Sequence, residues 1–115
     1  MSYMDNRRER RMPLNILLNK YIDGEPHTCR AVNLSRGGML LYKVFEPDAV
    51  PGEVSVEFQL PGSQRVLRAD CITLAEHPWA RAHGVRFTRM ADEDRDLLER
   101  FMNGEQLDDA VAAGP

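Results

Sequence analysis

Long apolar runs are missing from this 115-residue sequence. No window approaches the roughly 18 consecutive apolar residues of a transmembrane helix, so membrane insertion is not expected. The N-terminus also lacks the apolar core of a secretory signal. Only two cysteines are present, Cys29 and Cys71. Without a secretion signal they are interpreted as reduced, buried thiols, and the protein is expected in the cytoplasm.

Motifs of metal-dependent and nucleotide-dependent enzymes are missing as well. There is no CxxC or HExxH, and His27, His77 and His83 have no partners at metal-ligand spacing, so we expect them at the surface or in loops. Gly37-Gly38 precedes a strand-like segment, unlike a phosphate loop, which precedes a helix. Ser35 does not lie in a nucleophile-elbow sequence. We therefore expect a protein that is not an enzyme, with no metal and no cofactor.

The charge is unevenly distributed along the chain. The net charge is −3, yet residues 1–11 carry four arginines against two acids, and residues 88–115 carry three arginines against eight acids. Aromatic residues make up only 7% of the chain, and no strand interleaves basic with aromatic residues. A small basic region on an acidic protein suits a small anionic ligand better than a long nucleic acid.

Alternating apolar residues between turn formers predict short strands. The expected strands are Pro13–Tyr21, His27–Leu34, Met39–Tyr42, Val54–Leu60, Val66–Ala75 and Arg81–Thr88. The fourth and fifth should form a hairpin, with a twist or bulge near Asp70 because neither face of the fifth is uniformly apolar. Asp92–Met102 changes to helical spacing, with Leu97 and Leu98 in one apolar stripe. The pattern is typical of a six-stranded antiparallel β-barrel with one C-terminal helix packed on it.

The length favours a single domain. Residues 1–6 are expected to be a flexible N-terminus, and residues 7–103 the domain. Within it, residues 7–12 form an arginine segment, 13–88 the barrel and 91–103 the helix. Residues 104–115 are expected to be a mobile acidic tail.

Two polar motifs flank the first two expected strands. The segment 7–11 reads Arg-Arg-Glu-Arg-Arg and contains RxxxR, and the segment 33–38 reads NxSxxG. Alone, the second motif predicts a turn whose Asn and Ser side chains cap backbone groups and whose glycines supply positive φ. In this order, before six strands and a helix, the pair resembles the PilZ family of cyclic di-GMP receptors. The resemblance spans roughly residues 7–103 and includes a split-barrel-like fold.

The resemblance implies a ligand role for the arginine segment. Arg7 and Arg11 would bind the guanines and phosphates of cyclic di-GMP, and Arg8 would add a phosphate contact. The chemistry agrees, because arginine reads the O6 and N7 acceptors of guanine as a bidentate fork and carries a permanent charge for phosphate.

The second motif would complete the site. By the same resemblance, Asn33 and Ser35 would hydrogen-bond a guanine and its phosphate, and Gly38 would let the backbone approach the ligand. Trp79 is open to two interpretations, a half-buried anchor in a connection between strands or a stacking wall for a guanine.

The remaining arginines receive weaker assignments. Arg81 and Arg86 are candidates for outer phosphate contacts. Arg10 is expected to serve solubility, and Arg30 and Arg36 are expected to face solvent.

The resemblance therefore implies a receptor or adaptor that changes its surface on binding cyclic di-GMP and so regulates an unidentified effector protein, with a motility, exopolysaccharide or virulence output. The alternatives are a PilZ-like interaction module that does not bind nucleotide, a small-barrel nucleic-acid-binding protein and a split-barrel flavin enzyme. The sequence leaves open the affinity, one or two ligands per chain, the downstream process, and whether the protein is a monomer or a weak homodimer.

Overall fold

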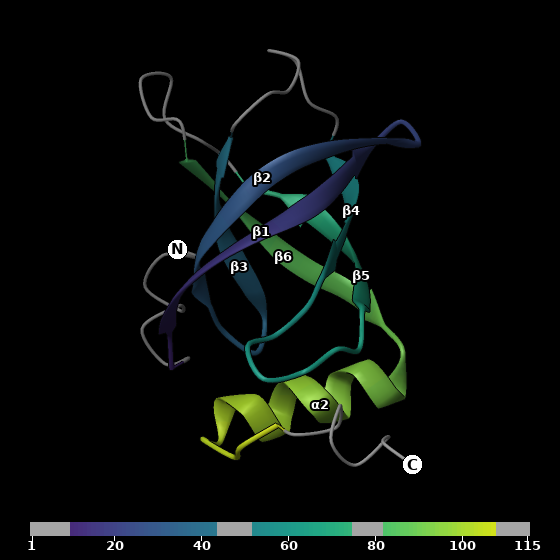
Figure 1. Ribbon diagram of the computed structural model, residues 1–115. Helices are drawn as coiled ribbons and strands as arrows, with labels where there is room; N and C mark the ends of the chain where they lie inside the picture. Colours follow the sequence, from purple (N-terminus) through teal and green to yellow (C-terminus); the bar gives the residue numbers. More distant parts are fainter. Residues whose placement is uncertain (1–9, 44–51, 75–81, 108–115) are drawn as a thin grey trace.

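The computed structural model describes residues 10–43, 52–74 and 82–107. Within these residues the chain forms six strands and one helix (Figure 1). The strands are β1 (Met12–Ile22), β2 (Glu25–Leu34), β3 (Gly38–Lys43), β4 (Glu53–Phe58), β5 (Leu67–Thr73) and β6 (Ala82–Met90). The helix, α2 (Asp92–Met102), has the bounds that its apolar spacing predicts.

The strands close into a barrel in the order β1-β2-β3-β6-β5-β4. All six neighbouring pairs are antiparallel, including the predicted hairpin of β4 and β5. A register shift between Asp70 and Cys71 confirms the irregularity predicted near Asp70. Figure 1 shows α2 lying across the lower end of the barrel. The prediction of an antiparallel barrel with a C-terminal helix is therefore confirmed.

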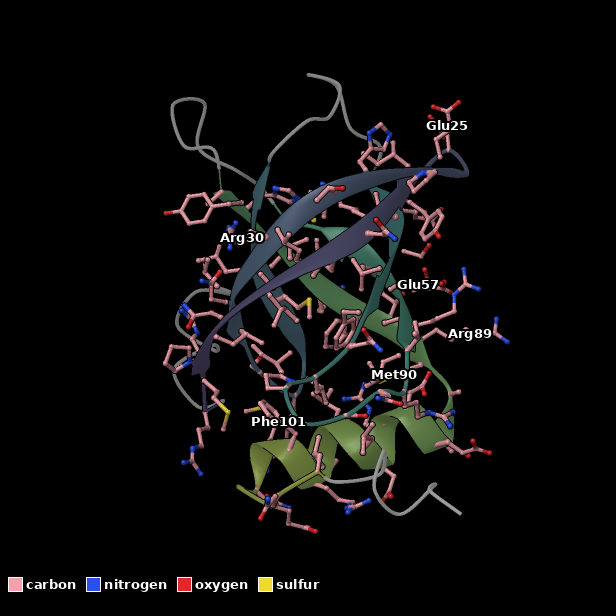
Figure 2. All side chains as sticks on the ribbon, in the orientation of Figure 1. Glu25, Arg30, Glu57, Arg89, Met90 and Phe101 are labelled. Atoms are coloured by element: carbon pink, nitrogen blue, oxygen red, sulfur yellow. The ribbon has the colours of Figure 1, made fainter. Side chains whose placement is uncertain are left out.

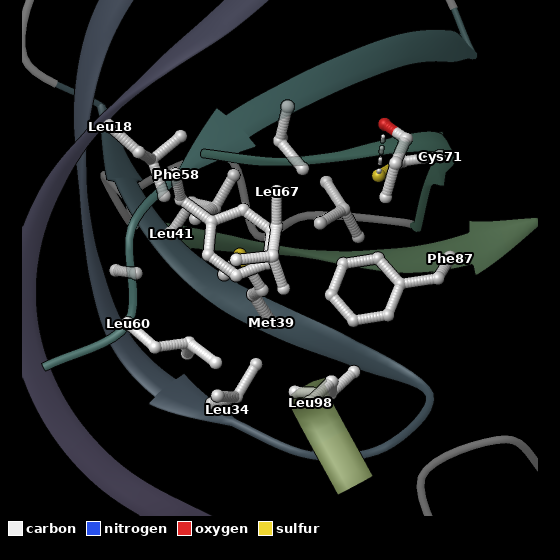
Figure 3. Close-up of a cluster of buried hydrophobic side chains, with 14 of the residues drawn as sticks. Leu18, Leu34, Met39, Leu41, Phe58, Leu60, Leu67, Cys71, Phe87 and Leu98 are labelled. Atoms are coloured by element: carbon white, nitrogen blue, oxygen red, sulfur yellow. Dashed lines mark hydrogen bonds between the residues drawn. The ribbon is translucent and has the colours of Figure 1, made fainter. Parts of the chain in front are cut away.

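Alternating side chains fill the barrel. In β4, Val54, Val56 and Phe58 are buried while the residues between them are more exposed. The ring of Phe58 stacks on that of Phe87 from β6, with centroids 6.3 Å apart and planes 7° from parallel. Leu98 of α2 joins the same cluster from below (Figure 3). Each such side chain contributes about 1.5–3 kcal/mol when fully buried, so this cluster holds strands and helix together.

Two polar side chains are enclosed with the core. Lys20 is fully buried, and its Nζ lies 2.8 Å from Nε2 of His83, which is also buried. The prediction that the histidines lie at the surface or in loops is wrong for His83. The signal was present in the strand pattern, because His83 shares a face with Val85 and Phe87, the two residues expected to point inward.

Both cysteines are free and buried, as the sequence predicts. Desolvation, with a further contribution from the charge of Asp70, raises the pKa of the Cys71 thiol to about 12, and Lys20 opposes this rise. A thiol with such a pKa stays protonated at neutral pH, and only the thiolate is a strong nucleophile. Cys71 is therefore a structural residue of the core.

The helix rests on the barrel through one side. Leu97, Leu98 and Met102 are buried, which confirms the predicted apolar stripe. Gly104 has a φ of 83°, the left-handed conformation of a residue that follows a helix end. No helix in the described ranges is both long and apolar enough to cross a membrane.

The packed chain continues past the helix. Leu107 is buried in the core, and its carbonyl oxygen lies 2.7 Å from where a Cβ of Gly62 would stand. The packed part of the chain therefore extends to Leu107, beyond Gly104, where the tail is expected to begin. Residues 108–115 lie outside the described ranges.

A buried carboxylate ties the start of α2 to the barrel. Asp94 is 6% exposed. Its Oδ1 accepts a hydrogen bond from Nε of Arg65 at 2.8 Å, and its Oδ2 accepts one from the backbone N–H of Arg68 at 3.2 Å. The side chain thus satisfies a donor at the start of β5 and fixes the helix against that strand.

Substituting Asp94→Ala should lower the free energy of unfolding by about 2–3 kcal/mol, because it removes a charged acceptor and leaves the Arg68 N–H without its partner. Urea unfolding should show a lower midpoint with an unchanged slope. Asp96→Ala, which truncates an exposed carboxylate on the same helix, is the matched control and should change the midpoint little. Equal losses in the two variants would contradict the structural role of Asp94.

Candidate functional site

The strand register brings the two sequence motifs together. Met12, the first residue of β1, pairs with Leu34, the last residue of β2. Because the strands are antiparallel, the chain just before Met12 lies beside the chain just after Leu34. Arg11 is therefore adjacent to Ser35, at the barrel end nearer α2 (Figure 1).

Arg11 and Asn33 belong to the same face. The next pair in the ladder is Pro13 with Asn33, and Asn33 also pairs with Leu40 of β3. Extending the alternation of β1 by two residues, we infer that Arg11 shares the outward face of Pro13, whereas Arg10 shares the face of Met12. Arg11 is exposed and Asn33 half-buried. The outer surface at this end thus combines a permanent cation with a neutral amide.

Both strands that carry the motifs are irregular here. The β1–β2 register shifts between Pro13 and Ile16, and the β2–β3 register shifts between Ala31 and Asn33. Such bulges change the direction of side chains and are frequent beside functional sites. They explain why Asn33 does not continue the regular pattern of the middle of β2.

Backbone hydrogen bonds define the turn between β2 and β3. The N–H of Ser35 donates to the carbonyl of Gly38 at 2.9 Å, and the N–H of Gly37 donates to Oγ of Ser35 at 3.3 Å. The N–H of Phe87 in β6 donates to the carbonyl of Gly37 at 2.8 Å. As the motif predicts, the serine caps local backbone, and the turn is fixed to a third strand.

Gly38 is required by a neighbouring strand. A Cβ on Gly38 would stand 2.1 Å from the carbonyl oxygen of Val85 in β6. Its φ is not positive, so the expected left-handed conformation is not the reason for this glycine. The motif glycine allows β3 and β6 to approach closely beside the turn. Its role toward a ligand stays a prediction.

Arg36 faces the helix, which corrects the expectation that it faces solvent. Its Nε lies 2.5 Å from Oε1 of Glu99, and its Nη2 lies 2.6 Å from Oδ1 of Asn103. Nη1 of Arg95 donates to the carbonyl of Arg36 at 2.5 Å. These partners are remote in sequence, so the local pattern around Arg36 carried no sign of them.

A further arginine lies beside the turn. Arg86 of β6 pairs with Gly38 of β3 and is exposed. The alternation of Val85 and Phe87 already places Arg86 outward, so the strand pattern contained this signal.

Comparison with protein families decides the classification. The sequence model of the PilZ domain matches residues 5–104, which is most of the chain. The chain belongs to the PilZ domain family. The resemblance drawn from the RxxxR and NxSxxG motifs is therefore confirmed at the level of the family.

Two solved structures share the fold of this chain. The inhibitor of motility MotI/DgrA of Bacillus subtilis is 15% identical, with a TM-score of 0.65 over 84% of this chain. This chain spans 51% of that protein, so it corresponds to about half of it. The PilZ domain of CeSA from a cellulose-synthesizing bacterium is 19% identical, with a TM-score of 0.60, and the match covers 83% of this chain and 96% of that one. A search of curated proteins found no match.

Some predicted site residues of this PilZ domain cannot be placed. Arg7, Arg8 and Trp79 lie outside the described residues, as does Arg81. The nearest described residue after Trp79 is Ala82, which pairs with Tyr42, near the end of β3 remote from Gly38. The ligand roles of these residues therefore stay predictions.

The described part of the site is suited to an anion. Arg11 and Arg86 supply permanent positive charge, and Asn33 and Ser35 supply neutral donors and acceptors. Among the described residues no group of His, Cys, Asp and Glu gathers that could hold a metal ion. These side chains offer the charge and the hydrogen-bonding groups that a phosphate and the polar edge of a base would require.

Proposed function

We propose that this protein is a receptor for cyclic di-GMP. The proposal is carried by one observation, the β1–β2 register that sets Arg11 beside the Ser35 turn. Arginine is the side chain that reads guanine O6 and N7 as a fork and also pairs with phosphate. Arg11, Asn33 and Ser35 would hold the ligand, together with Arg7 and Arg8 by their place in the motif. Arg86 would add a phosphate contact, and Trp79 is kept as a candidate for stacking.

The proposed protein acts as an adaptor rather than an enzyme. Binding would order the arginine segment on the outer surface of the barrel and so present a new surface to an effector protein. An intracellular second messenger would place the receptor in the cytoplasm. One structural neighbour is titled an inhibitor of motility, so a motility effect is a reasonable first output to test, alongside exopolysaccharide and virulence.

Isothermal calorimetry with the purified protein tests the proposal. Several charge-assisted hydrogen bonds at about 1.5–3 kcal/mol each, less the cost of ordering the segment, predict a dissociation constant between about 1 nM and tens of micromolar. Cyclic di-AMP is the matched control ligand, because it has the same two phosphates but replaces the guanine O6 acceptor with a donor.

The affinities for cyclic di-GMP and cyclic di-AMP, measured side by side, distinguish the possible outcomes. Cyclic di-AMP should bind about fivefold to 100-fold more weakly, since loss of a bidentate base contact costs about 1–3 kcal/mol. No heat with cyclic di-GMP at about 100 μM would reject the proposed function. Equal affinity for both ligands would show that charge alone drives binding and would reject the guanine assignment.

A further inference from the structure

The turn that carries Ser35 is held by a polar stripe of α2. Arg95 and Glu99 of α2 and Asn103, which caps the C-terminal end of the helix, are spaced four residues apart, so they lie on one side of it. This side differs from the apolar stripe that packs on the barrel. Each of the three side chains contacts Arg36, through its carbonyl, its Nε or its Nη2. The helix therefore binds the motif turn through both the backbone and the side chain of a single residue.

The contacts with Arg36 fix both its side chain and its backbone against the helix. The guanidinium of Arg36 donates to two acceptors about one helical turn apart, Glu99 and Asn103. The side chains of Arg36 and Glu99 are 37% and 38% exposed. The neighbouring residues in the turn, Ser35 and Gly37, are engaged in the backbone pattern that fixes the motif serine. A displacement of the Arg36 backbone toward or away from α2 also shifts Ser35, because one peptide separates them.

We propose that Arg36, Arg95, Glu99 and Asn103 form a latch that positions the Ser35 turn for its ligand and couples ligand binding to the seating of α2. The inference rests on the proposed function, and it assigns positioning roles to residues that lie outside the two motifs. Coupling of this kind is reciprocal: a ligand that favours the ordered turn also favours the docked helix. Binding of the ligand on the outer surface of the barrel would thus stabilise the docked position of α2.

Substitution of Glu99 is the decisive test, because the latch predicts weaker binding of cyclic di-GMP whereas simple electrostatics predicts stronger binding. Removing a carboxylate close to an anion site should strengthen anion binding by charge alone. If the carboxylate instead positions the turn through Arg36, Glu99→Ala should raise the dissociation constant for cyclic di-GMP about fivefold to tenfold. Glu99→Gln loses the same charge but keeps an acceptor oxygen for Arg36, so it should stay within about twofold of wild type.

The control comes from the same end of the protein. Glu105 follows α2, and its Oε1 lies 3.3 Å from Nε of Arg100. Glu105→Ala removes an equal charge without touching the latch and should leave the affinity within about twofold of wild type or slightly stronger. Thermal unfolding of each variant accompanies the titrations, so that a loss of affinity is compared with the loss of stability.

A second measurement needs no ligand. In the free protein, Glu99→Ala should speed amide hydrogen exchange at Ser35 and Phe87, the two N–H groups that close the turn, about tenfold relative to Glu105→Ala. If wild type binds no cyclic di-GMP but exchange rises in this way, the proposed function fails while the positioning of the turn stands. Unchanged exchange, tighter binding by Glu99→Ala, or a lower melting temperature with unchanged affinity would each overturn the latch.

Discussion

Replacing Arg11 with alanine is expected to raise the dissociation constant for cyclic di-GMP at least about 100-fold. The estimate assumes the loss of two charge-assisted hydrogen bonds at about 1.5–3 kcal/mol each, where every 1.4 kcal/mol is a factor of ten. Arg11 is the arginine that the β1–β2 register sets beside Ser35, on the outward face of Asn33. Calorimetry at one fixed salt concentration measures the change, because salt screens part of the attraction.

The adjacent arginine is a matched control for this prediction. Arg10→Ala removes an identical charge one residue away, but Arg10 shares the face of Met12 rather than that of Asn33. Its affinity should fall about threefold or less, the effect of a lost long-range attraction alone. Equal losses in Arg10→Ala and Arg11→Ala would indicate that the segment acts as diffuse charge, and the assignment of Arg11 would then be wrong.

A third arginine controls for general loss of charge. Arg89 of β6 is exposed, pairs with Asp70 of β5 rather than with β3, and is directed outward at the edge of the molecule (Figure 2). Arg89→Ala should leave the affinity close to that of wild type. Together with Arg10→Ala it separates the loss of any cation from the loss of this particular guanidinium.

The sequence predicted the elements because each has a strong local pattern. Alternation in Val54–Leu60 and the helical spacing of Asp92–Met102 are properties of the segments themselves, and both appear close to their expected bounds. The irregularity at Asp70 was also predictable, since a strand with two mixed faces cannot keep a regular register on a buried barrel. The proximity of the RxxxR and NxSxxG motifs could also be expected, because antiparallel pairing places the start of β1 beside the end of β2.

Contacts between distant elements were not predictable in this way. The ion pair of Arg36 with Glu99 joins residues 63 apart, and it depends on how the helix crosses the end of the barrel. Nothing in the local sequence specifies that crossing. The same holds for Lys20 and His83, also 63 apart, which meet only when β1 and β6 lie across the closed barrel.

Gly38 has a structural role in addition to the ligand role that the motif implies. The sequence assigns it to the approach of a ligand, yet its missing Cβ leaves space for the backbone of β6. The strand that needs this space also holds the turn, since the Phe87 N–H donates to the Gly37 carbonyl. Loss of the glycine would therefore affect the site through the fold, even without any direct contact to the ligand.

Substituting Gly38→Ala should consequently destabilise the protein by about 3 kcal/mol or more and weaken cyclic di-GMP binding with it. The new methyl carbon would lie 2.1 Å from the Val85 oxygen, whereas a carbon and a carbonyl oxygen normally approach to about 3.3 Å. The methyl is attached directly to the backbone of β3 and the oxygen belongs to the backbone of β6, so β3 and β6 must separate. Urea unfolding measures the loss of stability, and exchange of the Phe87 amide reports the opening between the strands.

Gly84→Ala is the matched substitution for this prediction, because Gly84 lies in β6 and pairs with Leu40 on the same outer surface. The nearest atoms to a Cβ at Gly84 would all belong to the Leu74 side chain, with Cδ1 at 3.3 Å, and the end of a leucine side chain can rotate away. Its cost should be about 1 kcal/mol or less. If Gly38→Ala were as stable as Gly84→Ala, β6 would not require the glycine. A selective loss of affinity in that stable variant would then favour the direct approach of the ligand to Gly38.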